Sequence, residues 1–143
     1  MARGRVLRAR CGGGPLSKAR AGRQSDHPDQ ITADPAPLVV GNTLYLYTSH
    51  DEDSATGFVM YDWLLYSSTD MVNWTDHGVI AGVRAPNKTF KWADGSNAWA
   101  PQAISRNGKF YLYVPFTKGG HMVIAVAVAD QLLEDRGQDG SLR

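Results

Sequence analysis

The chain carries an internal repeat, and this repeat limits its possible folds more than any other feature. Each copy has an Ala-Pro pair, a short apolar stretch, a tight turn and Tyr-Leu-Tyr, from Ala36 to Tyr47 and from Ala100 to Tyr113. The copies stand about 65 residues apart, a spacing typical of four-stranded propeller blades with long loops. We therefore predict one blade and most of a second.

Short β-type segments separated by turn residues fill the chain from Ile31 to about residue 130, and no segment has a convincing helical period. The expected strands are Leu38–Val40, Leu44–Thr48, Asp62–Ser67, Trp74–Ile80, Gln102–Ser105, Phe110–Phe116 and Met122–Ala129. The last of these is continuously apolar, which is typical of a strand buried on both faces. The sequence predicts an all-β fold.

The two ends differ from this middle. Residues 1–30 are rich in Gly, Arg and Ala without hydrophobic periodicity, so we expect a disordered leader or a wrongly assigned start; an anion-binding arm is the alternative. Residues 131–143 form a polar tail that we expect to be foreign to the domain at 31–130.

Charge and composition exclude several classes of protein. Residues 24–143 contain 8 basic and 14 acidic side chains, a net charge of −6, which argues against a nucleic-acid partner. Cys11 is the single cysteine, so no internal disulfide framework is expected. We find neither a membrane-spanning run nor a signal peptide, and the compartment and oligomeric state stay open.

Asp34 is the first candidate for chemistry. It lies in Ala33-Asp34-Pro35-Ala36-Pro37, where two prolines favour the start of an innermost, edge strand. A carboxylate there would point into the central channel of a propeller. The alternative is that Asp34 only begins a turn, and the pattern alone does not separate the two.

Several motifs in order resemble glycoside hydrolase family 43, which contains β-xylosidases, α-L-arabinofuranosidases and endo-arabinanases. They are Ala33–Pro37, Tyr45–Asp51, Tyr66–Trp74 and Ala98–Pro101. The resemblance covers about residues 31–130 and implies the first two blades of a five-bladed β-propeller. It also implies that Asp34 is the catalytic general base, acting on xylose- or arabinose-containing plant polysaccharides.

The resemblance implies hydrolysis with inversion. A carboxylate base activates water while a carboxylic acid about 6.5–9.5 Å away protonates the leaving oxygen. The family's acid is a glutamate from a later blade, and neither Glu52 nor Glu134 matches its motif. We therefore expect the chain to be truncated and inactive alone. A non-catalytic carbohydrate-binding remnant and a fragment without function are the alternatives.

Five further residues are candidates for contacting a sugar, because such sites combine flat apolar surfaces with a few polar groups. They are Trp99, Gln102, Asp51, Asp62 and Trp63. Trp99 could equally be a core residue between blades. We expect no cofactor and no metal: alternate side chains of an extended strand point apart, so the run from His50 to Asp53 reads better as a solvated loop.

Overall fold

The computed structural model describes residues 30–132, so most of the predicted leader and tail lie outside the described residues. Its strands are β1 (Ile31–Val40), β2 (Thr43–Asp51), β3 (Met60–Ser68), β4 (Thr75–Gly82), β5 (Gln102–Arg106), β6 (Lys109–Lys118) and β7 (His121–Ala129). All strand pairs are antiparallel. Residues 30–132 contain no helix, which confirms the all-β prediction and leaves nothing helical there to cross a membrane.

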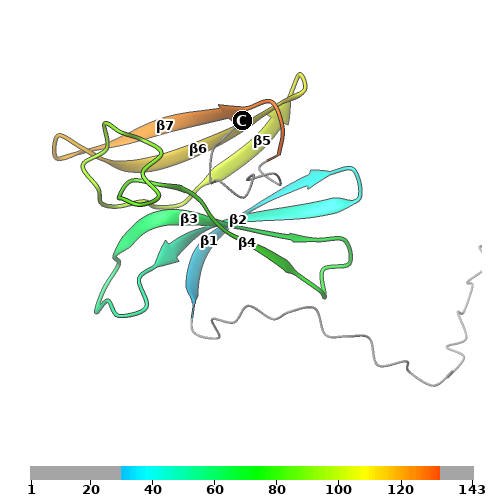
Figure 1. Cartoon of the computed structure of the whole chain (residues 1–143), viewed down its shortest axis with the longest axis horizontal. Coiled ribbons are helices and arrows are strands. Elements are labelled where there is room, and N and C mark those ends of the chain that lie inside the picture. Colours follow the sequence, from blue (N-terminus) through cyan, green and yellow to red (C-terminus); the bar gives the residue numbers. More distant parts are fainter. Residues whose placement is uncertain (1–29, 133–143) are drawn as a thin grey trace, which may run out of the picture.

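The strands form two sheets, one in the order β1-β2-β3-β4 and one in the order β5-β6-β7. Figure 1 shows them as two layers, with the loop 83–101 passing from the first sheet to the second. Every expected strand lies inside an observed one, except that Trp74 falls one residue before β4. Aromatic and β-branched residues suit this pleated surface, which explains the agreement.

β1 is an edge strand, as its prolines require. We expected the segment around Asp34 to lie at the start of a strand, and β1 begins at Ile31, three residues before Asp34. Thr32 and Ala33 already pair with β2, and the register then shifts between Ala33 and Ala36. Asp34 sits in this irregularity with a φ of 53°.

The main core lies between the sheets. The first sheet contributes its face with Tyr45, Tyr47, Trp63 and Leu65, all 5% exposed or less. Facing it are apolar side chains of the second sheet and of the connecting loop: Ala103, Leu112, Val114, Phe116, Ala125, Phe90 and Ala98. Burial, with Tyr45 nearby as a second cause, raises the pKa of the Tyr47 phenol to about 12.

β7 corrects one expectation. We expected a strand buried on both faces, but its side chains alternate between covered and exposed. Ala125 is buried, whereas Ile124 is 74% exposed and Val128 is 55% exposed. Continuous apolarity here marks a strand whose second face is uncovered in the part of the chain that the structure describes.

The turns have identifiable causes. Asn107 and Gly108 both adopt positive φ between β5 and β6, as a two-residue hairpin turn requires. After β3, the Asp70 carboxylate accepts hydrogen bonds from the backbone N–H of Val72 and Asn73 and from the Asn73 amide. These bonds, above all those from Asn73, hold the pKa of Asp70 well below its usual range.

Candidate functional site

Asp34 projects from an irregular position at the edge of the first sheet. Its side chain is exposed, and β1 contacts β5 of the second sheet. A positive φ is uncommon for a residue other than glycine, although Asp tolerates it better than most. Such strain is found where a side chain must point in a particular direction.

Ser49, on the neighbouring strand β2, contacts the Asp34 carboxylate. Its Oγ lies 3.1 Å from Asp34 Oδ2 and 3.0 Å from the carbonyl oxygen of Ala33. Ser49 is fully buried and lies opposite Ala33 in the β1–β2 ladder. The hydroxyl has one proton, so it donates to one of these two acceptors at a time. Sequence reasoning missed Ser49, although strand register would have placed it there once the bulge was known.

Trp63 and Trp99 are brought together, but in different environments. Trp63 is fully buried between Phe90 and Phe116, and its indole N–H donates to the carbonyl oxygen of Trp99 at 2.7 Å. This burial leaves Trp63 no surface for a sugar, so its role is to fix the backbone at Trp99. Trp99 itself is 40% exposed.

Asp62 lies against His50 across the β2–β3 pair. His50 Nδ1 and Asp62 Oδ1 are 2.8 Å apart, and both side chains are mostly covered. Glu52 completes a group whose ligand atoms lie within 4.8 Å of one another. Within residues 30–132 this group could accept a cation, and the sequence could not reveal it because Asp62 comes from the neighbouring strand. The hydrogen bond between His50 and Asp62 is the interaction that the structure shows within this group.

Two further candidates for sugar contact, Asp51 and Gln102, lie at the ends of strands. Asp51 ends β2, and its Oδ1 is buried without a hydrogen-bond partner in the described part of the chain. A buried carboxylate oxygen without a donor is costly, about 1–3 kcal/mol or more. Gln102 begins β5 with an exposed side chain.

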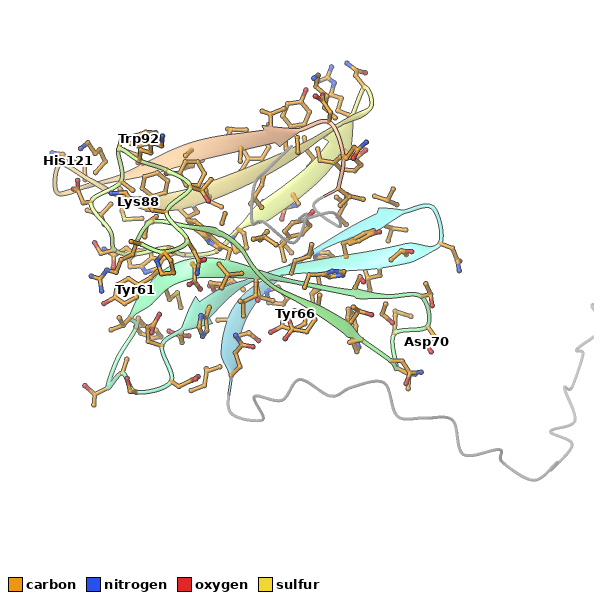
Figure 2. The ribbon with its side chains drawn as sticks, viewed as in Figure 1. Tyr61, Tyr66, Asp70, Lys88, Trp92 and His121 are labelled. Atoms are coloured by element: carbon orange, nitrogen blue, oxygen red, sulfur yellow. The ribbon has the colours of Figure 1, made fainter. Side chains whose placement is uncertain are left out.

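The loop between the sheets carries aromatic and basic side chains, among them Trp92 and Lys88 (Figure 2). Trp92 is 48% exposed, with its ring centroid 4.8 Å from that of Phe116. Arg84 stands 3.6 Å above the ring of Tyr61. Sequence reasoning did not foresee the Arg84–Tyr61 contact, because nothing in the local pattern links a loop residue to that strand.

Comparison with known proteins decides the family. Residues 29–135 match the model described as Glycosyl hydrolases family 43. The chain belongs to this family. It is 37% identical over 134 aligned residues to an arabinoxylan arabinofuranohydrolase of Paenibacillus polymyxa, covering 81% of this chain and 20% of that protein. It is 33% identical over 114 residues to a xylosidase/arabinosidase of Bacteroides ovatus, covering 73% and 34%.

A solved structure also supports the assignment of this chain to family 43. The GH43_1 enzyme from Xanthomonas citri, complexed with xylose, superposes with a TM-score of 0.63 at 38% identity. The match covers 71% of this chain and 30% of that enzyme. The chain therefore spans between a fifth and about a third of the length of these relatives.

Proposed function

We propose that residues 31–130 are the first two blades of a five-bladed family 43 propeller, which supplies the general base for inverting hydrolysis of xylose- or arabinose-containing plant polysaccharides. The observation that carries this proposal is the Asp34 carboxylate, exposed on a bulged edge strand and hydrogen-bonded from beneath by the buried Ser49. A base of this kind needs an open face toward water and a fixed direction. Asp34 has both.

Asp34 would take a proton from water as that water attacks the anomeric carbon. A carboxylic acid on the opposite side of the sugar would protonate the leaving oxygen, at about 6.5–9.5 Å from the base. Glu52 is the single glutamate of residues 30–132, and it lies with His50 and Asp62. We therefore expect the general acid to come from a later blade of the propeller, outside residues 30–132.

Sugar contact would come from the remaining candidate residues. Trp99 presents an exposed indole whose backbone is fixed by Trp63. Asp51 has one buried carboxylate oxygen without a partner, so it would need a local rearrangement to reach a sugar. Gln102 supplies an exposed amide. Asp62 would act through His50 rather than directly.

The test of catalysis uses a chimera in which residues 31–130 replace the matching segment of the Bacteroides ovatus relative. We expect turnover of an aryl xyloside or arabinofuranoside, and a fall in kcat of about 10²–10⁴-fold for Asp34→Asn. Asp53→Asn, an exposed carboxylate in the next loop, is the control. An active chimera that is indifferent to Asp34→Asn would reject Asp34 as the base.

The 143-residue chain alone is expected to show no turnover, because its described residues supply the base without a matching acid. Asp34-dependent turnover by this chain would contradict that expectation. The exposed Trp99 and Trp92 favour sugar binding as the second candidate function. A change in tryptophan fluorescence on adding xylo-oligosaccharide, lost in Trp99→Ala, separates a binding remnant from a fragment without function.

A further inference from the structure

The loop that joins the two sheets carries an excess of positive charge, in contrast to the first sheet. Residues 30–82 contain seven Asp and Glu side chains and no Lys or Arg. The loop 83–101 contains three basic side chains, Arg84, Lys88 and Lys91, against one acidic side chain, Asp94, and all four are exposed. A local excess of one sign of charge attracts ligands of the opposite sign.

Two of these basic side chains fold back over the middle of the loop. Lys88 Nζ donates a hydrogen bond to the carbonyl oxygen of Ala93 at 3.1 Å. A Cβ built on Gly95 would lie 3.9 Å from Arg84 Nε, so the Arg84 side chain passes the same segment. Lys91 precedes this segment in the chain and has no hydrogen-bond or ion-pair partner within the described part of the chain. The three cations therefore lie around residues 93–95.

The acid of this loop is already partnered. Asp94 Oδ1 lies 3.5 Å from Lys118 Nζ at the end of β6. Desolvation raises the pKa of Asp94, but hydrogen bonds from the backbone N–H groups of Gly119 and Gly120 and the charge of Lys118 outweigh it, so the pKa is lowered. Asp94 thus neutralises Lys118 and holds the turn between β6 and β7. The three basic side chains of the loop are left without a carboxylate among residues 30–132.

An exposed indole stands beside these cations. Trp92 is 48% exposed, and its ring centroid lies 4.8 Å from that of Phe116 and 6.3 Å from that of Phe90. These contacts hold the indole while leaving part of it open. Figure 2 shows Trp92 and Lys88 at the same end of the second sheet. The loop therefore combines a flat apolar surface, which suits the C–H face of a sugar ring, with uncompensated positive charge.

The same loop leads directly to Trp99, the exposed candidate for sugar contact. Asp94 N donates to the carbonyl oxygen of Thr117 at 3.1 Å, and Trp99 N donates to that of Pro115 at 3.2 Å. The segment from Asp94 to Trp99 is thus fixed along β6. It spans five residues, which is at most about 18 Å even when fully extended. One branched oligosaccharide could contact both ends of this segment.

We propose that the loop 83–101 binds a uronic acid substituent of the polysaccharide, with its sugar ring on Trp92 and its carboxylate at Arg84, Lys88 and Lys91. This inference rests on the proposed function, which supplies a plant polysaccharide as the ligand. A neutral sugar has no group that needs three cations. A uronic acid offers both a ring for the indole and a carboxylate for charge-assisted hydrogen bonds, so it would use both features of the loop.

The test compares two probes on the 143-residue chain by isothermal titration: a xylo-oligosaccharide carrying one glucuronic acid, and the same oligosaccharide without it. We expect the acidic probe to bind about tenfold more tightly at low salt, and the difference to shrink at high salt. Free sodium glucuronate should displace the acidic probe, whereas sodium acetate and sodium phosphate at the same concentration should not.

Matched variants locate the site. Lys91→Gln should weaken binding of the acidic probe about threefold, and the double variant Lys88→Gln/Lys91→Gln should remove most of its advantage while leaving the neutral probe unaffected. Lys109→Gln is the control, because it removes the same charge from a lysine that pairs with Asp130 at the other end of β6. Circular dichroism checks that each variant is folded.

Several outcomes would overturn the proposal. They are equal affinity for the two probes, no binding of either by a folded chain, equal displacement by phosphate, and a loss for Lys109→Gln as large as that for Lys91→Gln. None of these results bears on Asp34, because its role as a base is decided by turnover of the chimera. The uronic acid site and the general base can therefore fail independently.

Discussion

The two sheets carry the same repeat but leave its tyrosines in opposite environments. Tyr45 and Tyr47 are buried beneath the second sheet, whereas Tyr111 and Tyr113 are only partly buried among residues 30–132. The motif dictates strand and turn in both copies. Burial depends instead on the next layer, so equal sequence in two places does not give equal energetics.

The strongest test of this difference is a pair of matched truncations. Leu65→Ala, in the core between the sheets, should lower the free energy of unfolding by about 2–5 kcal/mol. Ile124→Ala, on the exposed face of β7, should change it by no more than about 0.5 kcal/mol. Urea unfolding of dilute chain measures both. Equal losses of unfolding free energy would show that the exposed face of β7 is covered in solution.

The next test concerns Gly82, the last residue of β4. A Cβ added at Gly82 would lie 2.8 Å from the backbone oxygen of Asn87, so the loop must shift. Gly82→Ala should cost about 1–3 kcal/mol of unfolding free energy. Gly57→Ala meets open space and should cost nothing. If both variants unfold at the same urea concentration as wild type, the loop does not pack on Gly82.

Substitutions in the turns of the two sheets should cost similar amounts of unfolding free energy. Gly41 and Asn107 adopt φ of 60° and 53° in the first turn of each sheet. Replacing either by Ala forces a side chain without local hydrogen bonds into this conformation, which costs about 1–2 kcal/mol. Thermal unfolding of both variants should give similar losses. A harmless Asn107→Ala would mean that the second hairpin is not held in this form.

The smallest effect is the pH dependence that Asp70 contributes from the turn after β3. The pKa of Asp70 is lowered in the fold by its bonds to Asn73, so its stabilisation is complete above the ordinary pKa of about 3.9 and is lost as pH falls toward the lower folded-state value. Melting temperatures measured downward from pH 5 should therefore fall less steeply for Asp70→Asn than for wild type. Thr69→Ala removes no charge and should keep the wild-type slope.

The strands and the family could be predicted from the sequence because both depend on local patterns, such as Tyr-Leu-Tyr and Asn107-Gly108. What could not be predicted depends on register. The contact of His50 with Asp62 continues the register that pairs Ser49 with Trp63, and no local motif reveals which residues of β2 and β3 lie opposite each other. Trp63 looked like a candidate for sugar contact, yet the face of β3 that it occupies is turned into the core.

The contact of Ser49 with two acceptors has a consequence for any acid–base role of Asp34. A base must change its charge during each cycle, and a neighbour that donated to it alone would lose its acceptor at that moment. The Ser49 hydroxyl can turn to the carbonyl of Ala33 instead, 3.0 Å away. The buried Ser49 hydroxyl therefore keeps a hydrogen-bond acceptor whichever of the two oxygens it faces.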